Sequence, residues 1–155
     1  MIIKGLNDTD FVNYRKPSMF IIFSKCSFKC GVKECQNSQI ALEPCIEVTN
    51  KRLIDLYNNN PLTSAIVCGG LEPFDSWDDL FSFIDDFRLE SDDDIVIYTG
   101  YIEEEIQDKV NILKDYDNII IKFGRYIPNQ TPHYDEVLGV KLASDNQYAR
   151  RINED

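Results

Sequence analysis

Short apolar runs alternate with amphipathic stretches along the chain. Four of these runs are brief, rich in β-branched or aromatic residues, and mostly continuous: Met19–Phe23, Ala65–Cys68, Ile95–Tyr98 and Ile119–Phe123. Strands that are buried on both faces of a parallel sheet have this pattern, whereas half-exposed strands alternate apolar and polar positions. The pattern therefore predicts four central strands of a parallel sheet.

Three helices are predicted in the intervals between these strands. Thr49 is placed to cap the first helix and Ser76 to cap the second. The third starts at about Ile102, and its first turn contains Glu103–Glu105, where the helix dipole favours carboxylates. Apolar residues at helical spacing would form the buried faces: Leu53, Leu56 and Tyr57 in the first helix, Trp77, Leu80, Phe81, Ile84 and Phe87 in the second, and Ile106, Val110 and Leu113 in the third.

This alternation of strands and helices predicts an α/β fold, either a partial (βα) barrel or an open, mainly parallel sheet with flanking helices. A complete eight-stranded barrel typically needs about 250 residues, and the chain has 155. We expect a single domain over residues 1–155. Its core would cover about residues 12–125, and residues 126–155, where the apolar periodicity fades, would be rich in loops.

Composition and charge narrow the range of functions. Hydrophobic residues make up 43% of the chain, which is typical of a globular protein. The net charge of −11 argues against binding to nucleic acid or to a membrane surface, because both need a basic face. No apolar run approaches the roughly 20 residues of a membrane-spanning helix, and the first residues lack the pattern of a signal peptide. We therefore expect a cytoplasmic protein.

Five cysteines provide the first specific chemical signal: Cys26, Cys30, Cys35, Cys45 and Cys68. An odd number of cysteines without a secretion signal disfavours a disulfide framework. Three of them lie within ten residues, directly after the first predicted strand. That position is where α/β folds place their ligand sites, so the cluster indicates a metal site.

Three interpretations of the cysteine cluster are open. Three thiolates can hold three irons of a 4Fe–4S cluster and leave the fourth iron accessible to a ligand, although most clusters have four protein ligands. Zinc could use Cys45 as its fourth ligand, but the sequence lacks the closely spaced cysteine pairs typical of structural zinc sites. Free cysteines are also common in protein cores, so three unrelated buried thiols are the third interpretation.

Two further segments follow the next two predicted strands. Gly69–Pro73 contains paired glycines, which let a backbone approach a ligand closely, and Glu72, which can accept hydrogen bonds from an ammonium group. Thr99–Tyr101 follows the third strand. Each segment alone is typical of an ordinary turn. Because the carboxyl ends of parallel strands share one edge of a sheet, we expect both segments to lie beside the cysteine cluster. The single histidine, His133, is expected to be a surface or core residue.

These motifs together resemble the radical S-adenosylmethionine enzymes. The resemblance rests on the three clustered cysteines followed by Gln36–Ser38, on Gly69–Pro73 and on Tyr98–Tyr101. Within that superfamily the chain is most similar to the family of small activases of anaerobic ribonucleoside-triphosphate reductases. Additional similarity lies in Val12–Asn13, Lys122–Tyr126 and Leu142–Gln147, so that the resemblance runs from about residue 12 to residue 150.

The chain departs from the family pattern at three positions. The usual cysteine spacing is Cys-x3-Cys-x2-Cys, so Cys35 comes two residues late. Glu34 stands where the family typically has an aromatic residue that contacts adenine. Leu71 is inserted between the paired glycines and Glu72, where the common form is Gly-Gly-Glu.

The resemblance implies a cofactor, a reaction and a partner. Cys26, Cys30 and Cys35 would hold a 4Fe–4S cluster, whereas Cys45 and Cys68 would not. S-adenosylmethionine would be bound by a second group of residues, namely Gly69, Gly70, Glu72, Thr99 and Tyr101. Reductive cleavage of S-adenosylmethionine would then generate a glycyl radical on a large anaerobic ribonucleotide reductase subunit. An external donor such as flavodoxin or ferredoxin would supply the electron, and no catalytic residue is expected beyond the cluster and the cofactor.

Two other functions are also compatible with the sequence. One is a non-catalytic interaction module that binds zinc or an iron–sulfur cluster. The other is a radical S-adenosylmethionine enzyme that acts on a different substrate, either a small molecule or a peptide.

Overall fold

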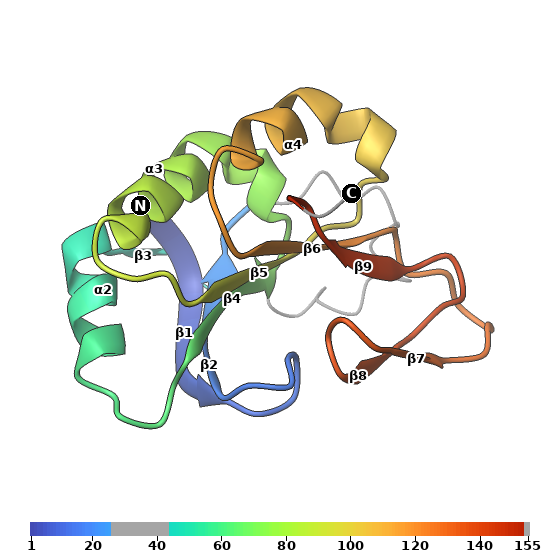
Figure 1. The fold of residues 1–155 in the computed structure, drawn as a ribbon, viewed down its shortest axis with the longest axis horizontal. Coiled ribbons are helices and arrows are strands. Elements are labelled where there is room, and N and C mark those ends of the chain that lie inside the picture. Colours follow the sequence, from blue (N-terminus) through green and yellow to red (C-terminus); the bar gives the residue numbers. More distant parts are fainter. Residues whose placement is uncertain (26–43, 154–155) are drawn as a thin grey trace.

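The computed structural model describes residues 1–25 and 44–153 of the chain, shown as a ribbon in Figure 1. The strands are β1 (Ile2–Asp10), β2 (Ser18–Phe23), β3 (Ile46–Glu47), β4 (Ala65–Gly70), β5 (Asp94–Tyr98), β6 (Ile119–Phe123), β7 (His133–Asp135), β8 (Val140–Leu142) and β9 (Tyr148–Arg151). The α-helices are α2 (Asn50–Asn58), α3 (Trp77–Arg88) and α4 (Gln107–Leu113). Two 3-10 turns, η1 (Pro73–Ser76) and η2 (Glu103–Ile106), precede α3 and α4.

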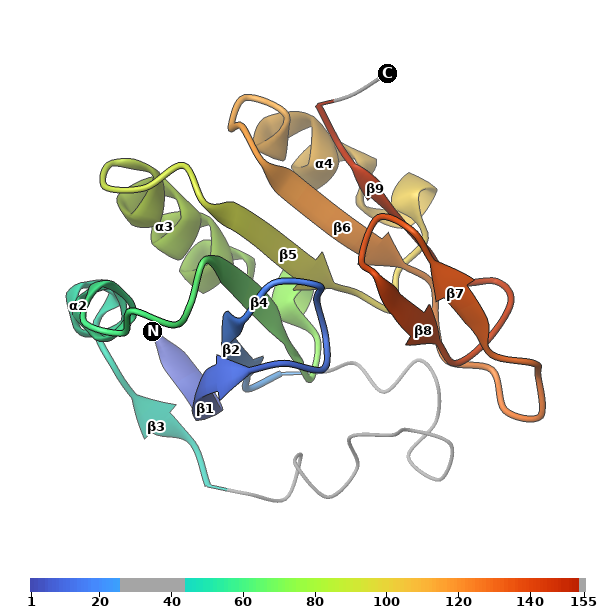
Figure 2. The same cartoon turned by 60° about the horizontal axis from the view of Figure 1, so that its bottom comes forward.

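One mixed sheet forms the centre of the described structure, with the strand order β3-β1-β2-β4-β5-β6-β9 (Figure 2). The four strands predicted from the continuous apolar runs, β2, β4, β5 and β6, pair in parallel at its centre. The outer strands β1, β3 and β9 pair antiparallel to their neighbours. The described sheet ends at β3 and β9 and is open, so the predicted mainly parallel sheet is confirmed and a barrel is not.

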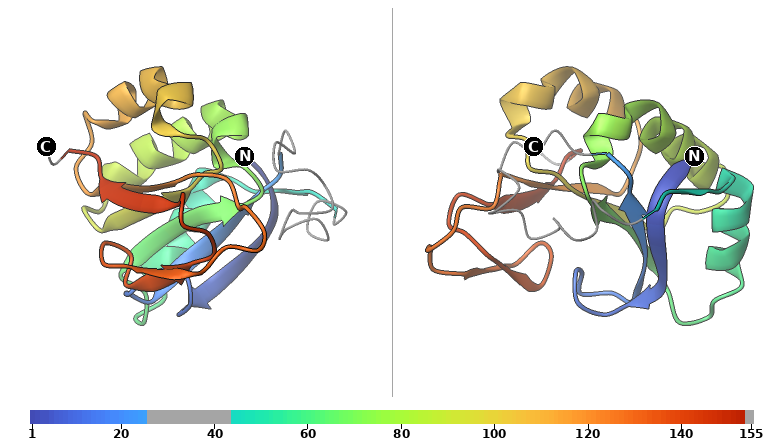
Figure 3. Two further views of the ribbon diagram at one scale, coloured as in Figure 1. Left: turned by 90° about the vertical axis from the view of Figure 1, so that its right-hand side faces the viewer. Right: turned by 180° about the vertical axis from the view of Figure 1, so that it is seen from behind.

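The central strands are buried on both faces, which explains why their sequences do not alternate. On β4, Ile66 and Cys68 face a core that is shared with α2, α3 and α4. Ala65 and Val67 face the opposite way and pack in a second core with Leu138. Figure 3 shows the helices over one face of the sheet and the β7–β8 hairpin on the other.

All three predicted helix starts are confirmed in outline, and one predicted capping bond is absent. The Thr49 hydroxyl accepts a hydrogen bond from the backbone N–H of Arg52 at 3.1 Å, as an N-cap residue does. The third helix begins with the 3-10 turn η2 and buries the three apolar residues that were expected, Ile106, Val110 and Leu113. Ser76 precedes α3, but its side chain makes no capping bond, because the turn η1 comes first and is capped by Glu72.

The buried face of α3 differs slightly from the prediction. Phe83 lies in the core with Leu80, Ile84 and Phe87. Trp77 and Phe81 are half-buried instead and pack on each other, with ring centroids 5.6 Å apart. The aromatic pair fills the outer edge of the contact between α3 and the rest of the helical layer.

The sequence analysis missed the peripheral strands β1, β3, β7, β8 and β9. Residues 126–153 are loop-rich as expected, but they also contain three of these strands, and β9 extends the central sheet beside β6. The core therefore reaches beyond residues 12–125, since Ile3 and Ile152 are both buried in it. Asp135 of β7 accepts the backbone N–H of Ala149 in β9 at 3.1 Å and thereby attaches the hairpin to the edge of the sheet.

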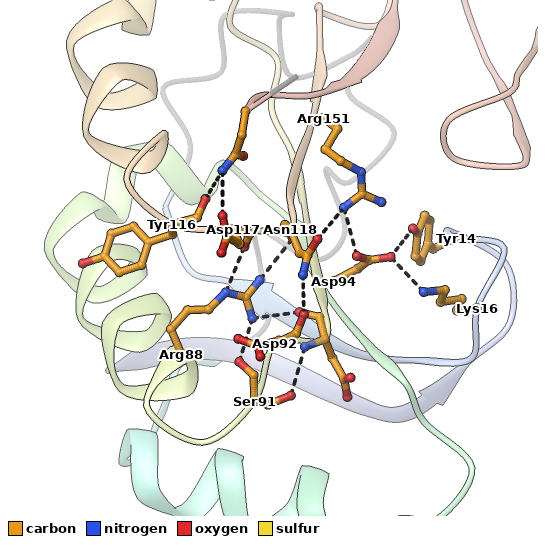
Figure 4. Close-up of polar contacts among 12 residues, drawn as sticks. Tyr14, Lys16, Arg88, Ser91, Asp92, Asp94, Tyr116, Asp117, Asn118 and Arg151 are labelled. Atoms are coloured by element: carbon orange, nitrogen blue, oxygen red, sulfur yellow. Dashed lines mark hydrogen bonds and ion pairs between the residues drawn. The ribbon is translucent and has the colours of Figure 1, made fainter. Parts of the chain in front are cut away.

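A buried carboxylate anchors the amino end of β5 to two distant segments (Figure 4). Asp94 accepts hydrogen bonds from the Tyr14 hydroxyl at 2.6 Å, from Lys16 at 3.0 Å and from Arg151 of β9 at 3.1 Å. Burial alone would raise the pKa of Asp94, but these three donors outweigh it and lower the pKa to about 2. The network holds the β1–β2 connection and β9 against the central strands.

The end of β4 needs a glycine. Gly70 has a φ of 83°, in the left-handed region that other residues rarely adopt. A Cβ atom at this position would overlap Cγ2 of Ile22 and lie 3.0 Å from the Ile22 Cα atom, which belongs to the neighbouring strand β2. Strand β4 can therefore make its last pairing with β2 only because residue 70 lacks a side chain.

We predict that Gly70→Ala lowers the free energy of unfolding by about 2–4 kcal/mol, from the left-handed backbone and the overlap together. Gly5→Ala is the matched control, because a Cβ atom at Gly5 would meet the same Ile22 side chain at 3.5 Å, an ordinary contact distance. The control should change stability by no more than about 0.5–1 kcal/mol. Urea unfolding of both variants measures the difference, and equal effects would contradict the structure.

Candidate functional site

All four parallel strands end at one edge of the sheet, and the segments selected from the sequence follow them there. In register, Phe23 of β2 pairs with Gly70 of β4, and Cys68 pairs with Ile97 of β5. Thr99 and Gly100 come directly after β5, and Gly124 comes directly after β6. The sheet therefore places Gly69–Glu72 and Thr99–Tyr101 on adjacent strand ends, as predicted.

The three clustered cysteines, Cys26, Cys30 and Cys35, lie outside the residues that the structure describes. The described chain stops at Lys25, one residue before Cys26. The Lys25 carbonyl oxygen accepts the backbone N–H of Glu72 at 2.7 Å. Lys25, which precedes the cysteine segment in the sequence, therefore lies beside Glu72, at the same edge of the sheet as the other predicted site residues.

The other two cysteines have separate environments. Cys68 is 0% exposed in the helix-side core, and burial raises the pKa of its thiol. Its surroundings are those of an apolar core residue, as the sequence suggests. Cys45 is exposed just before β3. Within residues 1–25 and 44–153, no three His, Cys, Asp or Glu side chains come together as a group that could hold a metal ion.

Glu72 is the centre of the described site. Glu72 is only 6% exposed, and it accepts hydrogen bonds from three donors among the described residues. The backbone N–H of Phe74 donates to Oε2 at 3.0 Å, and the backbone N–H of Gly100 donates to Oε1 at 2.7 Å. The Thr99 hydroxyl lies 2.9 Å from both oxygens. The carboxylate thus joins the loop after β4 to the loop after β5.

The electrostatic state of Glu72 follows from this burial. Removal from water raises the pKa of its carboxyl to about 7 from an ordinary value of 4.5, although the hydrogen bonds from Gly100, Phe74 and Thr99 lower it. Asp75 adds a smaller rise in the pKa through charge repulsion. A cation that binds next to Glu72 would favour the ionised form, so this group is suited to receive an ammonium.

The structure brings Thr99 and Tyr101 to the site and gives each a defined partner. Thr99 is 2% exposed, and its hydroxyl contacts Glu72. The Tyr101 hydroxyl donates to Asp75 at 2.5 Å, which makes a second bond between the same two loops. The Tyr101 carbonyl accepts the backbone N–H of Gly124 at 3.0 Å and so connects the end of β6 to this group.

Arg125 was not selected as a site residue from the sequence. It follows Gly124 at the end of β6, and its Cγ atom would lie 3.6 Å from a Cβ atom at Gly100. Its Nη2 atom pairs with Glu105 at 2.9 Å, and its buried Nε atom has no hydrogen-bond partner among the described residues. Its position directly after the fourth predicted strand was the signal that could have identified it.

A turn near the C-terminal end of the described chain donates hydrogen bonds to the backbone of Gly124 and Arg125. Asn146 donates to the Arg125 carbonyl at 2.9 Å, and Gln147 donates to the Gly124 carbonyl at 3.3 Å. His133 has a structural contact here, because its Nε2 atom lies 3.1 Å from the Ser144 carbonyl oxygen.

Comparison with known proteins identifies the class of this chain. A family model described as a 4Fe-4S single cluster domain matches residues 15–147. The chain is therefore an iron–sulfur protein. It belongs to the 4Fe-4S single cluster domain family.

Neither the curated proteins nor the solved structures contain a match to this chain. Among the residues that the structure describes, there is no helix with the length and apolar character required to cross a membrane.

The raised pKa of Glu72 predicts a pH-dependent stability. Because the folded chain holds this proton up to about pH 7 and the unfolded chain releases it at about pH 4.5, stability falls as the pH rises between these values. The difference in pKa corresponds to about 3 kcal/mol. Glu72→Gln removes this titration. We therefore compare the free energy of unfolding of wild type with that of the variant: the wild-type value minus the variant value should fall by about 3 kcal/mol as the pH rises from about 4.5 to about 7.

Urea unfolding of the two proteins at several pH values measures this difference. Glu90→Gln is the control, because it makes the same chemical change at an exposed side chain outside the site. A pH-independent difference for Glu72→Gln would show that the Glu72 carboxyl is hydrated in the folded protein.

Proposed function

We propose that this iron–sulfur protein is a radical S-adenosylmethionine enzyme of the activase type. One observation carries the proposal: Glu72 joins the loop after β4 to the loop after β5, and it also binds Lys25, the residue that precedes the cysteine segment in the sequence. A ligand held by Glu72 would therefore lie close to the start of that segment. The resemblance of the motifs to the activase family supports the same conclusion.

The donor set fits the cluster. Cys26, Cys30 and Cys35 would provide three thiolates within ten residues and leave one iron available for the amino acid part of S-adenosylmethionine. The reduced cluster, when bound, supplies one electron to the sulfonium, which breaks a C–S bond and yields methionine and a 5′-deoxyadenosyl radical.

The chain's own residues would bind and orient the cofactor. Glu72 would accept a hydrogen bond from the ammonium group of S-adenosylmethionine, an interaction that favours the ionised carboxylate. Gly69 and Gly70 would present their backbone to the ligand at the end of β4. Thr99 and Tyr101 would shape the adjacent side of the site. Burial of Glu72 and Thr99 keeps water away from this contact.

The proposed substrate is a glycine of a large anaerobic ribonucleotide reductase subunit. The 5′-deoxyadenosyl radical would take a hydrogen atom from this glycine, which leaves 5′-deoxyadenosine and a glycyl radical on the partner. Flavodoxin or ferredoxin would reduce the cluster by one electron before each cleavage. The net charge of −11 favours a protein substrate over a nucleic acid.

A product assay tests the proposed reaction. The chain is purified without oxygen, loaded with iron and sulfide, reduced chemically and incubated with S-adenosylmethionine, and 5′-deoxyadenosine is measured by chromatography. We expect 5′-deoxyadenosine to form only in the presence of reductant. Intact S-adenosylmethionine with a fully assembled cluster would favour the non-catalytic module, and zinc in place of iron would exclude the cluster in this chain.

Substitution of the cysteines tests the proposed ligands. Cys26→Ala, Cys30→Ala and Cys35→Ala should each abolish the absorption near ~400 nm that is expected of thiolate-bound clusters. Cys45→Ala is the matched control, since Cys45 is an exposed free cysteine before β3, and it should retain both the absorption and the cleavage of S-adenosylmethionine. Loss of the cluster in Cys45→Ala with retention in Cys35→Ala would instead identify Cys45 as the third ligand.

A further inference from the structure

The Thr99 hydroxyl has a fixed orientation. Its Oγ1 atom accepts the backbone N–H of Tyr101 at 3.0 Å, so one of its acceptor positions is occupied. Its single proton is then directed to Glu72, whose two oxygens both lie 2.9 Å away. Because Thr99 is 2% exposed, this hydroxyl is shielded from solvent by the chain itself.

The Glu72 carboxylate can accept one hydrogen bond beyond those that the described residues donate to it. An ionised carboxylate has about four acceptor positions. Within residues 1–25 and 44–153, donors fill three of them: the N–H groups of Phe74 and Gly100 and the hydroxyl of Thr99. The three donors hold the carboxylate in one rotational position, so its remaining acceptor position has a defined direction before any ligand arrives.

We propose that Thr99 is a positioning residue. It holds the Glu72 carboxylate in the orientation that receives the ammonium group of a nucleoside with an attached amino acid group, and it does not itself contact the ligand. The inference rests on the proposed function and deepens it, because it separates two residues that the sequence had placed in one ligand-binding group. Glu72 makes the contact, and Thr99 determines its direction.

The geometry also explains why the hydroxyl would matter for affinity. Without it, Glu72 would keep only two backbone donors and could turn about its terminal bond, so that part of the binding free energy would be used to fix the carboxylate. A ligand that lacks the ammonium group would not depend on this orientation. The effect of Thr99 should therefore be specific to ligands that carry an amino group.

A pair of nucleosides tests this inference. S-adenosylhomocysteine carries the amino acid group, and 5′-methylthioadenosine lacks it, while both share the adenosine part. The dissociation constants of both are measured by equilibrium dialysis with the cluster-loaded wild type and with Thr99→Val, Thr99→Ser and Glu72→Gln. Thr63→Val is the matched control, because it removes a threonine hydroxyl that contacts the Asn60 carbonyl, outside the site.

We expect wild type to prefer S-adenosylhomocysteine. Glu72→Gln should reduce this preference roughly 10- to 100-fold, as for the loss of a hydrogen bond to a charged group. Thr99→Val should reduce it about 3- to 10-fold, and its affinity for 5′-methylthioadenosine should not change. Thr99→Ser, which keeps the hydroxyl, and Thr63→Val should both behave as wild type. If Thr99→Val does not fold, Thr99→Ala removes the same hydroxyl without adding a methyl group beside the carboxylate.

The outcomes separate the inference from the proposed function. The positioning role of Thr99 would be overturned if Thr99→Val kept the wild-type preference for S-adenosylhomocysteine, or if it lost affinity equally for both nucleosides. In either case, a preference of the wild-type protein for S-adenosylhomocysteine would leave the proposed function intact. A wild-type protein that binds neither nucleoside would overturn the proposed function itself.

Discussion

The burial of one carboxylate organises the edge of the sheet where the proposed chemistry takes place. Glu72 accepts donors from its own loop and from the loop after β5, and its backbone N–H binds the Lys25 carbonyl at the end of β2. The Tyr101 carbonyl then connects this group to Gly124 after β6. The ends of all four parallel strands are thus linked by a hydrogen-bond network centred on Glu72, which is 6% exposed. Because the network is buried, one unpaired donor in it would cost more free energy of folding than an ordinary hydrogen bond contributes.

The amino ends of the parallel strands, at the other end of the sheet from Glu72, are held by a different kind of interaction. Asp94 at the start of β5 is ionised and binds Tyr14, Lys16 and Arg151, so opposite charges and a phenol balance its burial. At Glu72 the described donors are neutral, and burial leaves its pKa near neutrality. The two buried carboxylates therefore differ in how their charge is balanced: charged partners stabilise ionised Asp94, whereas the neutral donors of Glu72 leave the pKa of its carboxyl raised.

The central part of the fold could be predicted from the sequence because patterns within short segments of the chain specify it. Continuous apolar runs specify strands that are buried on both faces, and helical spacing specifies the helices that cover them. Strand β1 was missed because most of it is half-exposed and polar, and β9 because its place is set by pairing with β6 and by Asp94. The candidate site residues were selected by their position after strands, but the hydrogen bond between Glu72 and Thr99 joins residues 27 positions apart and needed the folded structure.

The hydrogen bond from the Ala149 N–H to Asp135 also affects how this molecule behaves among other chains. A strand at the edge of a sheet presents unpaired backbone groups, and foreign strands can add to them, which leads to aggregation. A side-chain carboxylate from the hairpin already occupies this N–H group in β9. A second strand could pair with Ala149 only by displacing Asp135 and leaving its charge beside the sheet. The hairpin therefore protects this edge strand against the addition of a foreign strand at Ala149.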